Sequence, residues 1–507
     1  MRDPAPRSSV DPLDVHDRRL LAAVHPAGWT NPRPAARYHL VVVGAGTGGL
    51  VSAAIAAGLG ARVALVERAR MGGDCLNTGC VPSKALLAAA RAWQGAREAA
   101  ERFGGPAVAG EGDFAAAMER MRRIRADIAP ADSAARFADE LGVDVFLGEA
   151  RFVAADALEV EGARLRFRRA IVATGARPAV PPVEGLAESG FLTSETVFSL
   201  TERPGHLAVV GAGPIGCELA QAFARFGSRV TLIEAAERVL PHDDPDAATV
   251  VAGALERDGV RVLTGASIQG VEASGAGKAL RVRRGAAEES VDATHLLVAA
   301  GRRPAVEGLG LEAAGIAYGE AGIAVDGRMR TSNPRVYALG DVAGRLRFTH
   351  AADAQARMVV RNALFFGRGK EEELVIPWCT YTSPEVAHVG PPAEALAGRG
   401  VETITVPLDE VDRARLDGAE DGFVRIHLAR GTDTIVAATI VAEHAGELIS
   451  QVAQAMTAGI GLAKVGETVF PYPTVAEALR KAADRWRRGK LTPLVRRGFA
   501  AYFRIRR

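Results

Sequence analysis

Two cysteines and a lysine lie close together in residues 72–84, which read GGDCLNTGCVPSK. Four residues separate Cys75 from Cys80, and Lys84 follows Cys80 by four positions. Two thiols at this spacing can close a tight disulfide, and a thiolate is the species that exchanges with disulfides or binds soft metals. If the chain from Val81 onward is helical, Cys80 and Lys84 share one helix face, and the cation favours the thiolate of Cys80. The stretch therefore indicates thiol redox or soft-metal chemistry.

The same cysteines have two simpler interpretations, which are two unconnected thiols in a loop and one half of a zinc site. Zinc sites usually space their ligands about two to four residues apart and need four of them. The remaining cysteines, Cys217 and Cys379, lie far away in different sequence surroundings. Spacing alone leaves the redox interpretation and the two simpler ones open.

A glycine-rich turn precedes this stretch and indicates a dinucleotide-binding unit. Residues 38–43 form a short β-branched run, an alanine-rich segment follows the glycines, and a second apolar run ends at Glu67. Such glycines let the backbone approach a pyrophosphate at the helix N-terminus, and the terminal carboxylate can bind ribose hydroxyls. Strand, glycines, helix, strand and acid agree, which makes the pattern more specific than a lone glycine motif. The glycines of the turn are Gly44, Gly46 and Gly49.

The whole unit then repeats further along the chain. Residues 207–210 lead into a second glycine turn, and residues 230–233 end at Glu234. Two complete patterns imply two dinucleotides, or one dinucleotide and a degenerate copy. Because the cysteine stretch follows directly on the first unit, we expect FAD there and a nicotinamide cofactor at the second. The glycines of the second turn are Gly211, Gly213 and Gly216.

Glu234 bears on the choice between NADH and NADPH. A carboxylate at the end of this strand accepts hydrogen bonds from the adenosine ribose hydroxyls and repels a 2′-phosphate. Arg238 lies four residues further on and could soften that repulsion. We expect NADH as the donor, with NADPH as the alternative.

Residues 72–84, together with these turns, resemble the class I pyridine nucleotide-disulfide oxidoreductases, which include dihydrolipoamide dehydrogenase, glutathione reductase and mercuric reductase. The resemblance covers roughly residues 38–485 and implies an α/β fold with two Rossmann-like domains, for FAD and NAD(P), and a C-terminal α+β dimerisation domain. The expected segments are an N-terminal extension (1–37), the FAD domain in two parts (38–190 and 304–370), the NAD(P) domain (191–303), the dimerisation domain (371–485) and a basic amphipathic tail (486–507).

The resemblance also implies roles for individual residues. Electrons would pass from the nicotinamide through the flavin to a Cys75–Cys80 disulfide. Cys80, which is nearer to Lys84, would face the flavin, and Cys75 would meet the substrate. Lys84 would pair with Glu218 beside the flavin N5 and would also contact FAD. By their order and spacing, the other FAD residues would be Thr174, Gly175, Asp341, Thr349 and His350, and Glu218 and Gly301 would contact the nicotinamide cofactor.

The sequence departs from the disulfide-reducing members near its C-terminal end. In those members a histidine, oriented by a glutamate, protonates the leaving thiolate, a task that needs a pKa near neutral. Here the glutamate is Glu477, but Tyr472 stands in place of the histidine. An unperturbed tyrosine has a pKa near ~10 and is a poor base at pH 7. We therefore expect slow reduction of lipoamide or glutathione disulfide.

Mercuric reductases resemble this chain at Tyr472, because they also carry a tyrosine there. A metal ion held by Cys75 and Cys80 would need soft ligands and two electrons rather than an acid. Those enzymes, however, end in a cysteine pair that this chain lacks, and Cys379 is either a substitute ligand or part of the core. A mercuric-type metal ion is the expected acceptor; the alternatives are a quinone or dye reductase, a dihydrolipoamide dehydrogenase-like enzyme and a non-enzymatic flavoprotein.

Composition and the chain ends bear on partners and compartment. The net charge of +2 gives no global attraction to nucleic acid, and four cysteines with no apolar leader favour the cytoplasm. The last 23 residues carry nine arginines or lysines and no acid. Their periodicity predicts an amphipathic helix that either lies peripherally on the inner face of an anionic membrane or packs on its own homodimer.

Overall fold

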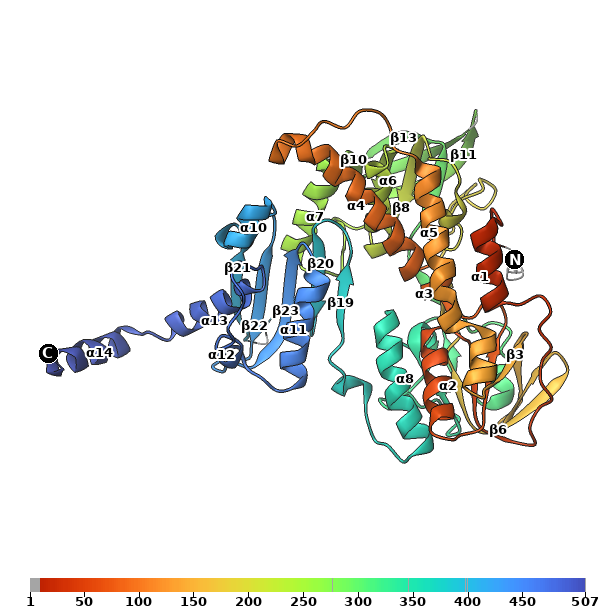
Figure 1. Ribbon diagram of the computed structural model, residues 1–507. Helices are drawn as coiled ribbons and strands as arrows, with labels where there is room; N and C mark the ends of the chain where they lie inside the picture. Colours follow the sequence, from red (N-terminus) through yellow and green to blue (C-terminus); the bar gives the residue numbers. More distant parts are fainter. Residues whose placement is uncertain (1–9, 276, 345, 397, 399, 507) are drawn as a thin grey trace. The chain divides into compact units, whose positions relative to one another are not determined.

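The computed structural model describes residues 10–506 except 276, 345, 397 and 399. The chain divides into two compact units, which are described separately (Figure 1). Unit 1 comprises Met1–Ala100, Pro106–Ala235 and Gly259–Leu374, and unit 2 comprises Glu101–Gly105, Ala236–Asp258 and Val375–Arg507. The domain boundaries expected from the sequence are finer than this division and stay predictions.

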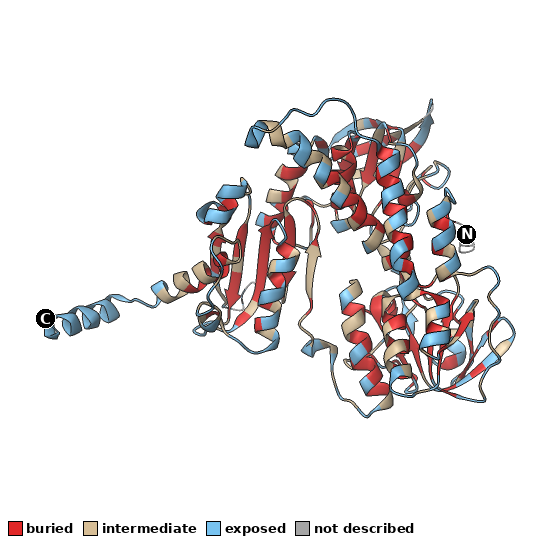
Figure 2. Cartoon of the chain, in the orientation of Figure 1, coloured by how far each residue is buried: buried red, intermediate tan, exposed pale blue. Residues whose placement is uncertain are grey.

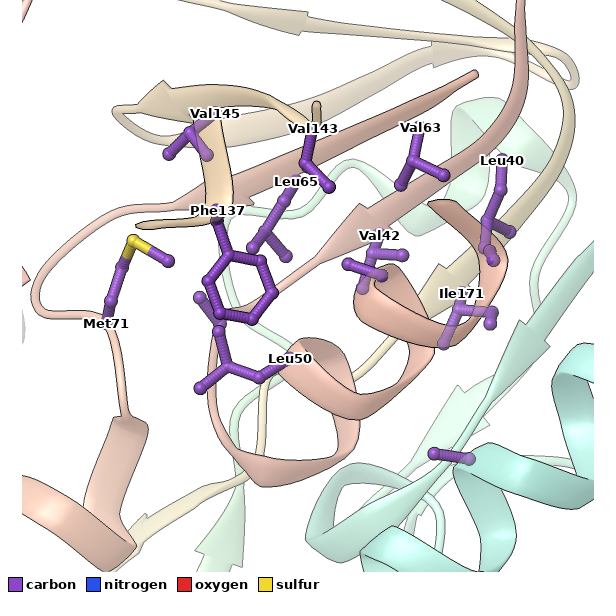
Figure 3. Close-up of a cluster of buried hydrophobic side chains, with 14 of the residues drawn as sticks. Leu40, Val42, Leu50, Val63, Leu65, Met71, Phe137, Val143, Val145 and Ile171 are labelled. Atoms are coloured by element: carbon purple, nitrogen blue, oxygen red, sulfur yellow. The ribbon is translucent and has the colours of Figure 1, made fainter. Parts of the chain in front are cut away.

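The first glycine turn of unit 1 lies in a seven-stranded sheet. Its central strand, β1 (Tyr38–Val43), pairs in parallel with β2 (Val63–Glu67) and β6 (Ala163–Val172). The apolar run of β1 is almost wholly buried, which is typical of a parallel strand covered on both faces. Leu40, Val42 and neighbouring side chains pack into one cluster with Phe137 (Figure 3). The remaining strands of the sheet are β3 (Asp144–Leu147), β4 (Ala150–Ala154), β5 (Ala157–Val160) and β18 (Val336–Ala338).

Helices connect and cover this sheet. α2 (Thr47–Gly58) starts directly after the glycine turn and packs against α8 (Thr349–Leu364). The other helical segments of this part are α1 (Val15–Val24), α3 (Gly73–Asn77), α4 (Cys80–Phe103), α5 (Phe114–Ile128), η1 (Ala129–Asp132), η2 (Arg136–Glu140), η4 (Leu311–Ala314), η5 (Gly340–Val342) and η6 (Glu371–Glu373).

The second glycine turn lies in a separate four-stranded parallel sheet with the order β10-β9-β8-β14. β8 (His206–Val210) leads into α6 (Pro214–Arg225), as β1 leads into α2. The other strands are β9 (Arg229–Ile233), β10 (Val260–Leu263) and β14 (His295–Val298). Unit 1 also contains η3 (Val197–Ser199), the antiparallel sheet β11 (Ala266–Ser274), β12 (Gly277–Arg284) and β13 (Ala287–Ala293), and the pairs β7 (Ala176–Pro178) with β15 (Arg302–Pro304) and β16 (Tyr318–Gly319) with β17 (Gly322–Ile323).

Residues 10–37 of the N-terminal extension pack on unit 1. Leu20 and Val24 of α1 are fully buried, and α1 lies against α5. The Trp29 indole donates a hydrogen bond to the Val145 carbonyl at 3.1 Å. The described part of the extension is therefore integrated into the fold, whereas residues 1–9 lie outside the described residues.

Unit 2 is built on a five-stranded antiparallel sheet with the order β19-β20-β23-β22-β21. The strands are β19 (Pro377–Thr380), β20 (Glu385–Val389), β21 (Glu402–Pro407), β22 (Phe423–Leu428) and β23 (Ile435–Ala442). Its helices are α7 (Pro245–Arg257), α9 (Ala393–Leu396), η7 (Leu408–Glu410), α10 (Asp412–Asp417), α11 (Ala445–Thr457), α12 (Leu462–Val465), α13 (Glu477–Gly489) and α14 (Pro493–Ile505).

The last helix differs from the others of unit 2. No residue of α14 is buried, whereas α13 buries Leu479, Ala482 and Ala483 (Figure 2). Across the described chain, no helix is both long enough and apolar enough to cross a bilayer.

Candidate functional site

The two cysteines lie in a compact turn between α3 and α4. Gly72 and Gly73 begin the turn with φ of 85° and 55°, a left-handed conformation that favours glycine. The Asn77 side chain then donates hydrogen bonds to the carbonyls of Met71 (3.0 Å) and Gly73 (2.8 Å). Cys75 is half-buried in α3, and Cys80, the first residue of α4, is exposed. We call residues 72–84 the redox loop.

The electrostatics of the redox loop separate the two thiols. A hydrogen bond between them lowers the pKa of Cys80 to about 6 and raises the pKa of Cys75. The Thr349 hydroxyl, 3.3 Å from the Cys80 sulfur, and the positive charge of Lys84 add to the lowering. Because α4 begins at Cys80, Cys80 and Lys84 share a helix face as the spacing predicts. Cys80 is thus the thiolate of the pair at neutral pH.

Lys84 connects the redox loop to the second dinucleotide unit. Its Nζ lies 2.8 Å from Glu218 Oε2, on α6. The Glu218 side chain is only 6% exposed, so the cation compensates a carboxylate that is largely removed from water. The structure therefore brings together a lysine and a glutamate that are 134 residues apart in the sequence.

The first glycine turn forms a narrow cradle with no space for a side chain at Gly44 or Gly49. Gly44 has φ of 98°, and a Cβ on Gly49 would lie 1.8 Å from the Gly44 carbonyl oxygen. The buried Glu67 accepts hydrogen bonds from the backbone N–H groups of Ala45 and Ala69, both at 2.7 Å. Burial raises the pKa of Glu67. A narrow glycine turn at the start of α2, with a carboxylate beside it, fits the pyrophosphate and ribose of a dinucleotide.

The redox loop presses directly on this cradle, because a Cβ on Gly73 would lie 2.5 Å from the Gly46 Cα. After β6, Gly175 adopts φ of 71°, and the Thr174 hydroxyl donates to the Ala305 carbonyl at 2.8 Å. The chain thus returns beside the cradle at these predicted cofactor residues. At the start of α8, the His350 ring stacks on Phe348 with centroids 5.6 Å apart, next to Thr349.

Asp341 has a partner that the sequence analysis missed. The Arg302 Nε lies 3.3 Å from Asp341 Oδ2, and the same guanidinium pairs with Asp74 of the redox loop. Burial raises the pKa of Asp341. Arg302 directly follows Gly301, and this neighbouring position is the only feature of the sequence that could have marked Arg302 as a site residue. The guanidinium therefore links the redox loop to Asp341, an acid predicted to contact FAD.

The second glycine turn has the same backbone as the first but is more open. A Cβ on Gly216 would lie 1.8 Å from the Gly211 carbonyl oxygen, whereas one on Gly213 would meet nothing within 4 Å. Glu234 Oε2 accepts the Ala212 N–H at 2.6 Å. Gly301, with φ of 110°, also has open space where a side chain would project. The turn therefore leaves room for a cofactor to enter.

Arg238, which could soften the repulsion between Glu234 and the 2′-phosphate of NADPH, already has partners within unit 2. Its Nη2 lies 3.0 Å from Glu394 Oε1 and donates to the Pro241 carbonyl at 2.8 Å. A guanidinium already paired with a carboxylate is a weaker attractor for a phosphate than a free one.

Tyr472 and Glu477 lie in unit 2. The Tyr472 hydroxyl donates to Asp412 Oδ2 at 2.9 Å, and this hydrogen bond raises the pKa of Tyr472. Glu477 is buried and pairs with Arg480, and its Oε2 has no hydrogen-bond partner among the described residues. Asp412 therefore makes Tyr472 a weaker proton donor at neutral pH than an ordinary tyrosine, which suits it poorly to protonate a leaving thiolate.

The other two cysteines have ordinary packing environments. Cys217 is fully buried on α6 and donates to the Ala212 carbonyl at 3.2 Å. Cys379, on β19, packs against the core of unit 2, with its sulfur 3.8 Å from Glu385 Oε2. Within the described ranges, no three His, Cys, Asp or Glu side chains cluster closely enough to hold a metal ion. The zinc interpretation has no geometric support there.

Two further features escaped the sequence analysis. A pocket of about 330 Å³ lies beside Cys80, between α4 and α5. Its walls are mostly apolar, and its lining residues are Cys80, Val81, Lys84, Ala85, Ala88, Arg120, Ile124 and Ile128. On each helix these residues are spaced so that they lie on one face, which the sequence could have indicated. Nothing in the sequence, however, predicted that α4 and α5 lie side by side.

The second feature connects the N-terminal helix to the redox loop. Arg125 on α5 lies 2.8 Å from Asp17 Oδ1 on α1, and its other terminal nitrogen donates to the Asn77 carbonyl at 2.8 Å. The Arg125 side chain is 3% exposed and that of Asp17 is 0% exposed. Asn77 lies between the two cysteines, so a buried ion pair anchors the middle of the redox loop.

Comparison with known proteins agrees with this site. The model of the pyridine nucleotide-disulphide oxidoreductases matches residues 38–356, and the model of their dimerisation domain matches residues 376–483. The chain belongs to this family, as a class I member. It is a flavin-dependent enzyme that uses FAD and NAD(P)H, which leaves the non-enzymatic alternative without support. The dimerisation domain supports a homodimer.

Several relatives of different specificity are similar over most of the chain. A mercuric reductase from Streptomyces lividans is 37% identical over 460 residues, covering 88% of this chain and 96% of the relative. A dihydrolipoyl dehydrogenase from Thermus scotoductus is 35% identical, covering 88% and 97%. The Cu(II) complex of the HOCl-induced flavoprotein disulfide reductase RclA from Escherichia coli has a TM-score of 0.78 and 29% identity, covering 87% and 98%. These values are too alike to single out an acceptor.

Proposed function

We propose that this enzyme passes electrons from NADH through FAD to the Cys75–Cys80 pair and on to a soft divalent metal ion of the mercuric type. Two features of the chain together carry the proposal: the Cys80 thiolate is stabilised, and a tyrosine, Tyr472, stands at the acid–base position. The first supplies a soft ligand, whereas the second cannot act as the acid–base group that disulfide substrates need.

The cofactor assignment follows from the two glycine turns. FAD, when bound, would accept a hydride from the nicotinamide and deliver two electrons to the disulfide. The cradle of Gly44, Gly46 and Gly49 would hold its pyrophosphate and Glu67 its ribose. Thr174, Gly175, Asp341, Thr349 and His350 would line the rest of the flavin. The open turn of Gly211, Gly213 and Gly216, with Glu234 and Gly301, would take the nicotinamide cofactor. Glu234 and the paired state of Arg238 favour NADH.

The charged residues of the redox loop have defined tasks in this proposal. Lys84 stabilises the Cys80 thiolate and compensates Glu218, so that the reduced pair keeps a negative charge in a partly buried site. Cys75, whose pKa is raised, holds its proton until a metal ion displaces it. In the balanced reaction NADH becomes NAD⁺, a proton is released, and the two electrons go to one Hg(II) ion or, one each, to two Cu(II) ions.

The choice of a metal ion rests on chemistry shared with relatives. Two neighbouring thiolates are the ligands that soft ions select. The Streptomyces relative is a mercuric reductase, and the RclA flavoprotein has been captured with Cu(II). Mercuric and cupric ions are therefore the first acceptors to test.

The test measures NADH oxidation by the full-length, FAD-loaded protein with Hg(II), Cu(II), lipoamide, glutathione disulfide and a quinone. We expect turnover with Hg(II) that is lost in Cys75→Ser and in Cys80→Ser. Cys379→Ser is the matched control, because this thiol lies in unit 2 and packs on the core. Metal reduction that survives both redox-loop substitutions, or rapid lipoamide reduction by the wild type, would contradict the proposal.

Tyr472 provides a sharper discrimination between acceptors. An acid–base group contributes about 10²- to 10⁴-fold to such reactions. We therefore expect Tyr472→His to raise lipoamide reduction by at least about tenfold without changing flavin reduction by NADH. Tyr472→Phe is the control, because it removes the hydroxyl without supplying an imidazole. Equal lipoamide rates in wild type and Tyr472→Phe, both slow, would support the absence of an acid at this position.

The apolar pocket beside Cys80 favours a second candidate, a quinone or dye reductase. Its volume of about 330 Å³ and its walls from α4 and α5 suit a flat apolar acceptor. Ala88→Trp would fill the pocket while leaving the redox-loop thiols in place. Under this candidate the substitution would depress quinone reduction and spare Hg(II) reduction. If both activities are unchanged, the pocket does not serve an acceptor.

A further inference from the structure

The last helix of unit 2 forms by its own local signals. The Thr492 hydroxyl caps α14 by accepting the Val495 N–H at 3.4 Å, and Pro493 occupies the first helical turn. All thirteen residues of the helix remain unburied (Figure 2). The N-terminus of α14 is therefore stabilised by its cap and not by the burial of an apolar face.

One side of α14 is apolar and faces solvent. Large apolar side chains recur with helical periodicity, and each is well exposed, with Leu494 at 78% and Ile505 at 85%. A contiguous exposed patch of this kind marks an interaction surface rather than random surface variation. Its members are Leu494, Val495, Phe499, Tyr502, Phe503 and Ile505.

The opposite side of α14 is cationic. Arg496, Arg497 and Arg504 lie on that side, and Arg506 rests over the Tyr502 ring at 5.4 Å. No acid occurs after Asp484, so nothing in the tail neutralises these charges. Two copies of the tail packed apolar face to apolar face would leave these arginines on the outer sides, in water and without anionic partners from the tail. An anionic surface would instead complement the arginines while the apolar side chains leave water.

We propose that α14 docks the enzyme on an anionic lipid bilayer, lying in the interface with its apolar face inserted among the acyl chains and its arginines at the headgroups. The proposal goes beyond the electron acceptor and does not depend on it. The shortness and charge of the helix make this a surface attachment rather than a span, in keeping with the absence of any spanning helix in the described chain.

The test uses the full-length, FAD-loaded dimer and sedimentation with two kinds of vesicle. One kind contains phosphatidylcholine alone, and the other contains phosphatidylcholine and phosphatidylglycerol in equal amounts. We expect binding to the second kind that is at least about tenfold tighter and that weakens as salt rises. Binding to both vesicles alike, or to neither, would overturn the proposal.

Variants separate the two faces of the helix. Phe499→Ser with Phe503→Ser removes apolar side chains, and Arg496→Gln with Arg497→Gln removes charge; each pair should weaken binding by about tenfold or more. The control is Phe366→Ser, which removes a still more exposed phenylalanine outside the tail. NADH oxidation in solution should be unchanged in all of them, which distinguishes this result from failure of the proposed function. If the phenylalanine variant instead turns dimers into monomers and binds vesicles as before, the face serves a second copy and the proposal is wrong.

Discussion

The two glycine turns of unit 1 share a backbone but differ in what surrounds them. A Cβ on Gly49 or on Gly216 would lie only 1.8 Å from a carbonyl oxygen, and Glu67 and Glu234 each accept a hydrogen bond from the backbone N–H that follows the first glycine of their turn. The first turn, however, is pressed by the redox loop at Gly73, whereas Gly213 of the second turn faces open space. Enclosure suits a group that stays bound through turnover, and openness suits one that exchanges.

Additional segments enclose the first turn. The redox loop lies on it, Arg302 ties that loop to Asp341, and Arg125 ties it to the N-terminal helix α1. The second turn has a direct ion-pair link to this assembly through Glu218 and Lys84. The same local motif thus serves two purposes, which are decided by chain segments far from it in sequence.

The largest expected effect comes from placing a methyl group in each turn. Gly49→Ala should yield protein without flavin, because its Cβ collides with backbone that cannot move. Gly216→Ala should keep its flavin but lose at least about a hundredfold in the rate of flavin reduction by NADH. The flavin-to-protein absorbance ratio and stopped-flow reduction measure the two outcomes. Gly213→Ala, with open space for its methyl, should keep its flavin and raise only KM. Loss of flavin from both Gly49→Ala and Gly216→Ala would erase the distinction between the turns.

The anchoring of the first turn predicts the next largest effect. Arg125→Ala leaves Asp17 as a buried, uncompensated carboxylate and should lower the free energy of unfolding by about 3 to 5 kcal/mol. Urea denaturation followed by flavin fluorescence would measure it. Arg19→Ala, which breaks an exposed pair with Asp127, is the matched control and should cost about 0 to 1 kcal/mol. Equal losses in the two variants would mean that the buried pair does not anchor the enclosed turn.

The position of Lys84, which pairs with Glu218 and lies near Cys80, predicts a pH effect on the reactivity of Cys80. With a Cys80 pKa of about 6, alkylation of the reduced protein at this thiol should rise with pH through that value and level off above it. Lys84→Met removes a nearby cation and should move the midpoint upward by about one unit or more. Iodoacetamide labelling read by mass spectrometry at Cys80 would follow it. An unchanged midpoint in Lys84→Met, as expected of the control Lys464→Met, would show that Lys84 serves Glu218 alone.

The smallest effect concerns donor choice at the open turn. A hydrogen bond to a charged group is worth about 1.5 to 3 kcal/mol, so Glu234→Ala should narrow the preference for NADH over NADPH by about tenfold in kcat/KM. The exposed Glu237→Ala is the control and should leave the ratio unchanged. A wild-type preference for NADPH would reverse the assignment.

The local motifs of this chain could be predicted because their signals lie within a few residues. Strand, glycine turn, helix and terminal acid recur in order at both turns, and the one-face spacing of Cys80 and Lys84 follows from a helix start. The amphipathic period of the tail likewise predicts α14. The Lys84–Glu218 pair was expected only because the motifs resemble a known family.

The rest of the site depends on pairings that no local pattern encodes. Arg302 meets Asp74 across 228 residues, and Arg125 meets Asp17 across 108. The partner of Tyr472, Asp412, lies 60 residues before it. A single charged residue has no periodicity, so its partner becomes visible only once the sheets and helices are in place. The pocket beside Cys80 was missed for the same reason, because it needs two helices to close.

The contact between Arg125 and the Asn77 carbonyl has a practical consequence for anyone who shortens the protein. A version that begins at Tyr38, where the family match starts, lacks helix α1 with Asp17 and leaves the Arg125 guanidinium beside the redox loop without its carboxylate. The freed positive charge would favour the anionic, dithiol form of the loop. The thiol–disulfide midpoint potential of such a version would then be more positive than that of the full chain, and values measured on it would not describe the intact enzyme.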